Sequence, residues 1–241
     1  MGSLRSNLHS VAHQDWKSKL TLLHCISSDL KIIHSQELIH RDLHSGNILL
    51  NSLHSAYIAD LGLSISTSIA LKTKRHGIYG IIPYIALETL DRGQYTTASD
   101  IYSFGIIMWE ILYGKSVSYN QEFGIRLQIE ICSNDLRPTV IGNNPQSYLS
   151  LMKKCWEKKP ENRPSAIEIC ETLNEWQNDG NVLLELVKSE EIINSTYLQA
   201  YPNNIYKSKF IEHTTTILHQ GSFIIFLLNK FYLILIISYN I

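Results

Sequence analysis

The strongest constraint on the fold is an apolar repeat near the start of the chain. Between Trp16 and Ile33, large apolar residues recur at steps of three or four. This spacing puts them on one face of a helix, and a continuous apolar face must be buried. We therefore expect a long helix packed into a core. Hydrophobic residues make up 44% of the 241 residues, which is enough for one sizeable core. The repeat consists of Trp16, Leu20, Leu23, Ile26, Leu30 and Ile33.

Short apolar runs follow this helix at residues 38–39, 48–50 and 57–59. Polar or turn residues bound each run, a pattern typical of short strands with loops held between them. Loops held by a rigid scaffold often carry the chemistry of a protein.

Further helices are predicted in the second half of the chain. A mostly apolar one begins at Thr96 or Thr97 and stops at Gly114, which places it at the centre of the core. The others are expected over residues 122–132, 148–156 and 165–176.

Beyond about residue 177 the helical periodicity fades. Residues 178–220 are polar and are predicted to form a linker or tail, while residues 221–241 form an apolar tail of unknown role. The apolar run 223–239 is interrupted by Asn229 and Lys230, and it is shorter than the roughly 20 residues of a membrane-spanning helix. Two interpretations of this run are open: it contacts a membrane, or it is translated non-coding sequence.

The bulk charge argues against one class of function. Lys and Arg number 21 against 22 Asp and Glu, a formal net charge of -1. Such a chain has no excess of positive charge for a phosphate backbone, so no nucleic-acid partner is expected. The four cysteines include no C-x-x-C pair, which favours reduced thiols and a cytoplasmic location. The alternative location is membrane attachment through residues 223–239.

Five polar motifs follow one another along the chain. Any one alone is explained as a solvated turn, but the first lies between two predicted strands and the second ends an apolar strand. Their polar side chains can therefore be aimed at one point. The motifs are His40-Arg41-Asp42-Leu43-His44-Ser45-Gly46-Asn47, Asp60-Leu61-Gly62, the segment from Gly80 to Glu88, Asp100-Ile101-Tyr102-Ser103-Phe104-Gly105, and the segment from Cys155 to Pro164.

In this order the motifs resemble the catalytic segments of eukaryotic protein kinases, most closely the tyrosine-kinase-like branch of the serine/threonine kinases. The resemblance implies a protein-kinase-like α+β fold. Residues 1–177 are expected to form a mainly α-helical C-lobe with short β-hairpin strands around the catalytic loop. No Gly-rich loop, strand Lys or helical Glu precedes the first motif, so the N-lobe is expected to be absent.

The resemblance also implies catalytic and metal-binding roles. Asp42 would orient the acceptor hydroxyl and take its proton, with His40 and Arg41 in the same catalytic tripeptide. Asn47 and Asp60 would hold magnesium. The implied cofactors are ATP and magnesium.

The remaining assignments concern nucleotide contact and structure. Leu49 matches the residue that forms the lower face of the adenine slot. Glu88 and Arg163 are expected to form a buried ion pair. Asp100 is expected to tie down the backbone of the catalytic loop.

The implied function is transfer of the γ-phosphate of ATP to Ser or Thr hydroxyls of protein substrates, or to Tyr. His44 and Ile81 stand where serine/threonine kinases usually carry Lys and Thr, so the choice of hydroxyl stays open. Without an N-lobe the chain is expected to be an N-terminally truncated fragment, inactive alone. The alternative is a non-catalytic kinase-like binding module or decoy.

Overall fold

The computed structural model describes residues 1–72, 78–119, 122–142, 144–188 and 205–214. Its core is built on two helices, α2 (Trp16–Ser35) and α5 (Thr97–Tyr113). The α2 helix starts where the Asp15 side chain accepts a hydrogen bond from Ser18 N at 2.7 Å, which satisfies one of the free N–H groups of the first turn. The α5 helix is buried along almost its whole length and ends at Gly114, whose φ of 66° is left-handed.

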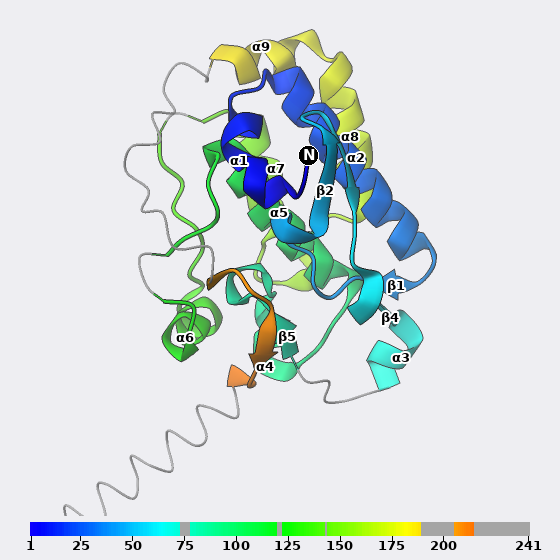
Figure 1. The fold of residues 1–241 in the computed structure, drawn as a ribbon, viewed down its shortest axis with the longest axis vertical. Coiled ribbons are helices and arrows are strands. Elements are labelled where there is room, and N and C mark those ends of the chain that lie inside the picture. Colours follow the sequence, from blue (N-terminus) through cyan, green and yellow to red (C-terminus); the bar gives the residue numbers. More distant parts are fainter. Residues whose placement is uncertain (73–77, 120–121, 143, 189–204, 215–241) are drawn as a thin grey trace, which may run out of the picture.

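The other long helices pack around these two. In Figure 1, α2 and α8 (Ala166–Asn178) run side by side, and α1 (Leu4–Ala12) lies near the N-terminus. The α7 helix (Gln146–Cys155) packs on α5. Shorter or more peripheral helices are α3 (Thr67–Lys72), α4 (Leu87–Arg92), α6 (Ile125–Asn134) and α9 (Gly180–Lys188).

Gly105 sets the distance between α5 and α7. A Cβ at this position would lie 2.9 Å from the Cβ of Cys155 and 3.2 Å from the carbonyl oxygen of Met152. Only a residue without a side chain fits such a close approach.

The strands in the described residues form three two-stranded antiparallel sheets. The predicted hairpin is β2 (Ile48–Ser52) paired with β3 (Ser55–Ile58). A second sheet joins β1 (Leu38–Ile39) to β4 (Ile65–Ser66). The third joins β5 (Ile78–Gly80) to β6 (Lys209–Ile211), which comes from the far end of the chain. The loop between β1 and β2 contains the first motif.

Part of the segment expected to be a linker or tail is structured. Asp179 Oδ1 accepts a hydrogen bond from Asn181 N at 2.8 Å at the start of α9, and Leu186 in α9 is fully buried. The α9 helix packs against α2 and α8. Its apolar face adds to the same core, so the helical part of the domain extends past residue 177.

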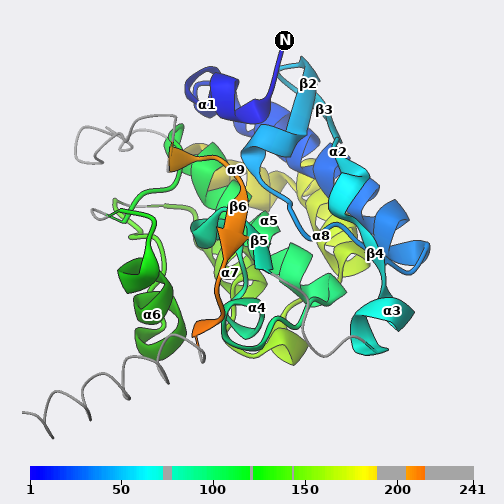
Figure 2. The same ribbon diagram turned by 60° about the horizontal axis from the view of Figure 1, so that its bottom comes forward.

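The described part of the tail also includes residues 205–214. Figure 2 shows β6 running beside β5 across the face of the molecule. The apolar tail 221–241, with its run 223–239, lies outside the described residues. Within the described ranges, none of the helices combines the length and apolar character needed to cross a membrane.

Candidate catalytic site

Asp100 in α5 holds the loop that carries the first motif. Its Oδ2 accepts hydrogen bonds from His40 N at 2.8 Å and from His34 Nε2 at 3.0 Å, and its Oδ1 accepts one from Arg41 N at 3.0 Å. Arg41 has a φ of 74°, a conformation that costs free energy in a residue other than Gly. The buried carboxylate therefore stabilises a strained turn just before Asp42, in the place that the sequence predicted for this anchor.

His40 ties the loop to the segment directly after β3. Its Nδ1 accepts a hydrogen bond from Asp42 N at 3.3 Å, and its Nε2 donates one to Ala59 O at 3.1 Å. One ring nitrogen thus accepts and the other donates, which is the pattern of a neutral imidazole. His40 positions Asp42 relative to the neighbouring Asp60, and its side chain does not line the cavity described next.

Asp42 lies on the wall of a cavity of about 510 Å³. Its side chain is 8% exposed. Burial raises the pKa of Asp42, and the hydrogen bond from Ser208 opposes this rise. A carboxylate with a raised pKa is a better proton acceptor. The cavity is lined by Asp42, His44, Asn47, Asp60, Gly62, Leu63, Tyr79, Tyr206, Lys207 and Ser208.

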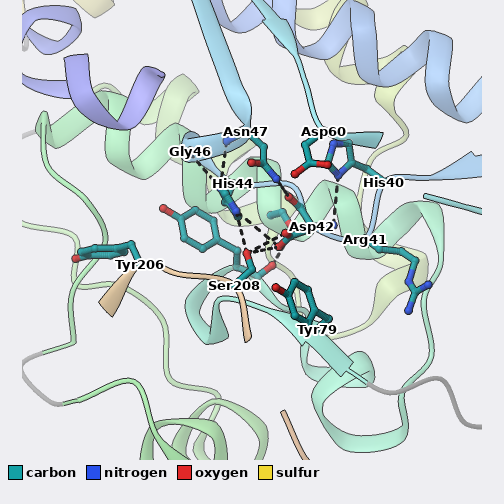
Figure 3. A network of polar contacts seen from close by, with 12 residues as sticks. His40, Arg41, Asp42, His44, Gly46, Asn47, Asp60, Tyr79, Tyr206 and Ser208 are labelled. Carbon is teal, nitrogen blue, oxygen red and sulfur yellow. Dashed lines mark hydrogen bonds and ion pairs between the residues drawn. The ribbon is translucent and has the colours of Figure 1, made fainter. Parts of the chain in front are cut away.

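Asn47, just before β2, and Asp60, two residues after β3, line the same cavity (Figure 3). Asn47 Nδ2 donates to the carbonyl oxygen of Asp42 at 2.9 Å, so the amide oxygen is the atom left for a ligand. Asp60, with a φ of 60°, accepts a hydrogen bond from Gly62 N at 3.3 Å through Oδ1. The structure brings both residues of the predicted magnesium site to the cavity that contains Asp42.

This donor set fits magnesium. A carboxylate and an amide oxygen are hard ligands, and magnesium in phosphate-transfer sites uses one or two carboxylates together with substrate phosphates. Across the described residues there is no group of three or more His, Cys, Asp or Glu side chains able to hold a metal. Asn47 and Asp60 would therefore hold the ion jointly with the nucleotide.

Ser208, which sequence reasoning missed, contacts Asp42 directly. Its hydroxyl donates to Asp42 Oδ2 at 2.9 Å and Oδ1 at 3.0 Å. Ser208 is one of several hydroxyl residues in a polar stretch, and no spacing or motif sets it apart in the sequence. Its role depends on the β5–β6 pairing, which joins residues far apart in the chain.

His44 orients the Ser208 hydroxyl. Its Nδ1 accepts hydrogen bonds from Gly46 N at 3.0 Å and Asn47 N at 3.2 Å. Burial, followed by the nearby charge of Arg5, lowers the pKa of His44 to about 3, so the ring is neutral and its proton is on Nε2. That nitrogen donates to Ser208 Oγ at 3.2 Å, which directs the serine proton toward Asp42 (Figure 3).

Besides His40, two residues with predicted catalytic or nucleotide-binding roles lie away from this cavity. The Arg41 guanidinium stacks 4.4 Å from the ring centre of Tyr95, and its Nη1 donates to Leu63 O at 3.4 Å. Leu49 is half-buried in β2, where it bridges to Ser3. Neither side chain lines the cavity, and the adenine contact of Leu49 remains a prediction.

Glu88 and Arg163, predicted to pair, are in contact. Arg163 Nη1 donates to Glu88 Oε1 at 2.7 Å, and Nη2 donates to Oε2 at 2.9 Å. Arg163 also donates from Nε to Glu157 O at 2.8 Å and from Nη1 to Ala98 O at 2.9 Å. The guanidinium therefore joins α4, the start of α5 and the loop before α8.

Comparison with known proteins agrees with this geometry. A sequence model of the family described as protein tyrosine and serine/threonine kinase matches residues 1–173. The chain belongs to the protein kinase family. The match spans all five motifs, and it starts at the first residue of the chain.

Individual kinases resemble the chain at moderate identity. A probable LIM domain-containing serine/threonine-protein kinase of Dictyostelium discoideum is 33% identical over 156 residues, which are 65% of this chain and 16% of that relative. Serine/threonine-protein kinase STY17 of Arabidopsis thaliana is 28% identical over 151 residues, 62% of this chain and 26% of that relative. Mitogen-activated protein kinase kinase kinase 13 of Pongo abelii is 31% identical over 140 residues, 58% of this chain and 14% of that relative. The kinase chain thus spans between 14% and 26% of the length of these relatives.

Proposed function

We propose that this kinase domain transfers the γ-phosphate of ATP to Ser or Thr hydroxyls of protein substrates. One observation carries the proposal: the carboxylate of Asp42 shares a cavity with the side chains of Asn47 and Asp60. Phosphoryl transfer needs an oriented hydroxyl, a proton acceptor and ligands that hold the nucleotide phosphates through a metal. The serine hydroxyl already bonded to Asp42 supports a Ser or Thr acceptor, because it shows that an aliphatic hydroxyl fits there.

The chemistry follows from the position of Asp42. An acceptor hydroxyl donates its hydrogen bond to the carboxylate, which orients the oxygen lone pair toward the phosphorus. As the new O–P bond forms, the hydroxyl proton passes to Asp42, the bond from phosphorus to the bridging oxygen breaks, and ADP leaves. Magnesium, when bound, neutralises charge on the phosphates. Asn47 and Asp60 would hold it.

The nucleotide side of the reaction needs further groups. The 241 residues contain no Gly-x-Gly-x-x-Gly segment, which this family uses to cover the ATP phosphates. We propose that an N-lobe in a longer form of the protein supplies this loop and the phosphate-binding Lys. The 241 residues alone would then transfer phosphate poorly, since charged contacts that stabilise a transition state are each worth about 2.7 to 4 kcal/mol.

Location and partners are part of the same proposal. The four cysteines are all free thiols, which suits the reducing cytoplasm. We propose ATP and a protein substrate as partners, and no nucleic acid.

A second candidate function is a kinase-like binding module without catalysis. The observation in its favour is that Ser208 occupies the hydrogen-bonding positions of Asp42. A protein that does not catalyse phosphate transfer could keep the hydrogen bonds between Ser208 and Asp42 permanently.

The two functions are separated by a transfer assay. The chain of 241 residues and a form extended upstream would each be incubated with labelled ATP, magnesium and a generic protein substrate. We expect label transfer by the extended form, its loss in Asp42→Asn, and normal transfer in the matched control Asp91→Asn, which changes a carboxylate outside the cavity. An inactive extended form would favour the binding module. Robust transfer by the 241 residues, lost in Asp42→Asn, would disprove the need for an N-lobe.

A further inference from the structure

The segment 205–214 forms part of the wall of the cavity and adds a strand beside β5. Its β6 residues pair antiparallel with β5: Ile211 with Ile78, Phe210 with Tyr79, and Lys209 with Gly80. Figures 2 and 3 show the segment passing beside β5 and placing Ser208 next to Asp42. Addition of an extended segment to a sheet edge is a common mode of peptide recognition, in which the backbone supplies affinity and alternate side chains supply specificity.

Tyr206 anchors the segment on one side of Ser208. It is 4% exposed, and its hydroxyl donates to Val117 O at 2.8 Å. Its ring meets that of Phe123 edge-on with centres 5.3 Å apart, and its carbonyl accepts a hydrogen bond from Arg5 Nη1 at 2.8 Å. A buried aromatic ring with a satisfied hydroxyl is the kind of contact that dominates binding energy in an interface.

A second anchor lies on the other side. Ile211 is 6% exposed and Thr214 is 1% exposed. The Thr214 hydroxyl donates to Leu90 O at 3.1 Å and accepts from Gln128 Nε2 at 2.9 Å. Gln128 Nε2 also donates to Glu212 O at 2.6 Å. The body of the domain therefore holds the segment on both sides of Ser208.

Between the anchors, the side chains differ in what they contact. Ser208 faces Asp42, Lys209 Nζ donates to Phe123 O at 3.1 Å, and Phe210 is 69% exposed. The surface of the domain that makes these contacts is called the groove below. It holds an aromatic residue, Tyr206, two positions before the hydroxyl and an apolar residue, Ile211, three positions after it. The exposed Phe210 is not among these contacts.

Building on the proposed function, we propose that residues 205–214 occupy the groove that receives the acceptor segment of a protein substrate, as a competitor within the same chain. Ser208 stands where the acceptor hydroxyl of a substrate would stand. The substrates of this groove are then extended segments with an aromatic residue at position -2 and an apolar residue at position +3 relative to the acceptor. Such a substrate binds only when the resident segment leaves.

Tethering makes the resident segment an effective competitor. A segment attached to its own site experiences an effective concentration on the order of 1 mM. A free peptide with the same contacts would therefore bind the unmodified chain poorly, and it would bind much better once the resident contacts are weakened. This difference can be measured without ATP or phosphate transfer.

The test uses a fluorescent peptide with the sequence of residues 205–214 and three forms of the full chain. Tyr206→Ala removes an anchor of the resident segment and leaves the groove intact, while Phe210→Ala is the matched control on an exposed residue of the same segment. By fluorescence anisotropy we expect the peptide to bind Tyr206→Ala at least about tenfold more tightly than the unmodified chain. Phe210→Ala should bind like the unmodified chain. Equal affinity for all three forms, or binding to none, would overturn the proposal.

A second variant, hydrogen exchange and altered peptides locate the binding. Ser208→Glu should open the groove as Tyr206→Ala does, because its carboxylate would lie beside that of Asp42 and repel it. In both variants, amide hydrogen exchange of residues 78–80 should become faster and should slow again when the peptide is added. Unchanged exchange in both variants would refute the docking. Peptides that lack the Tyr206 or Ile211 side chain should bind the opened chain more weakly, and equal binding of all peptides would refute the sequence preference.

The outcomes are independent of the proposed function. If the chain binds the peptide as expected but its extended form transfers no phosphate, the docking of residues 205–214 is supported and the catalytic function is refuted. If the extended form is active but no form binds the peptide, the catalytic function is supported and the competitor proposal is refuted.

Discussion

Arg163 and Glu88, 75 residues apart in the chain, face each other through two parallel hydrogen bonds of 2.7 and 2.9 Å. The Arg163 side chain is fully buried and that of Glu88 is 11% exposed. Bidentate geometry strengthens such a pair, and the extra bonds to Glu157 O and Ala98 O satisfy further donors of the guanidinium.

Arg163→Ala should strongly destabilise the fold. Removing one partner of a buried pair leaves the other charge unpaired, which typically costs about 3 to 5 kcal/mol of unfolding free energy. Urea denaturation measures the change. Arg92→Ala is the matched control. The Arg92 side chain, which pairs with Asp91, is 72% exposed, so this pair should contribute about 0 to 1 kcal/mol to stability. A midpoint for Arg163→Ala no lower than that of the control would contradict a structural role for this pair.

Asp100→Ala should loosen the loop that carries Asp42. The substitution leaves the N–H groups of His40 and Arg41 without their acceptor, and each unsatisfied buried group costs about 1 to 3 kcal/mol. Hydrogen exchange should become faster at these two amides, and the denaturation midpoint should fall. Replacement of the exposed Glu161 by Ala is the control and should change neither. Slow exchange at both amides in Asp100→Ala would show that other contacts hold the loop.

Asp60→Ala should weaken metal binding in the presence of nucleotide. Mn²⁺, a paramagnetic substitute for magnesium, would be added with ADP to the extended form, and the bound metal would be measured by electron paramagnetic resonance. Changing groups that only support metal ligands typically costs 10- to 100-fold in affinity, so loss of a direct ligand should cost at least about tenfold. Glu161→Ala should bind as the unmodified protein does. Equal binding by Asp60→Ala would remove Asp60 from the proposed metal site.

Glu110 should make the stability of the fold depend on pH. This residue is fully buried in α5, and burial raises its pKa above the usual 4.5. The folded state then keeps the proton to a higher pH than the unfolded state does. The contribution to stability is fully present below about pH 4.5 and is lost as the pH rises through the folded-state pKa.

Glu110→Gln, which carries no charge, should remove this part of the pH dependence. Unfolding free energies of the two proteins, measured by urea denaturation between about pH 4.5 and 8, should converge at the acid end and separate in favour of the variant as the pH rises. Parallel curves would show that Glu110 titrates alike in the folded and unfolded states. The hydrogen bonds that Glu110 accepts from Tyr84 and Val117 can be kept by the amide oxygen.

The helices were largely predictable because their signals are local. The repeat from Trp16 to Ile33 lies within α2 (Trp16–Ser35), and the predicted stop at Gly114 is the observed end of α5. The helix expected over 122–132 is shifted to α6 (Ile125–Asn134), which starts after Gly124. The α9 helix was not predicted and lies in the region assigned to a linker. Its apolar face is short, so the apolar repeat is too short to be recognised among the polar residues around it.

The site was predictable only in part. Asp42, Asn47 and Asp60 lie in motifs whose order along the chain is typical of one catalytic site. In the structure all three line one cavity. The hydrogen bond from Ser208 to Asp42 spans 166 residues, and it depends on a strand pairing that no local pattern encodes. The tautomer of His44 likewise follows from two backbone N–H groups that only the folded loop brings to its ring.

The absence of a side chain at Gly105 also affects the position of residues away from the contact with α7. Asp100 lies five residues before it on the same rigid helix, and Met152 and Cys155, which touch Gly105, lead into the loop that ends at Arg163. The close approach of the two backbones at Gly105 therefore helps to fix the position of Asp100, which holds the loop before Asp42. A methyl group at position 105 would force α5 and α7 apart, and we expect this to shift Asp100 relative to Arg163. The alignment of the site then depends on a packing distance between residues that do not line the cavity.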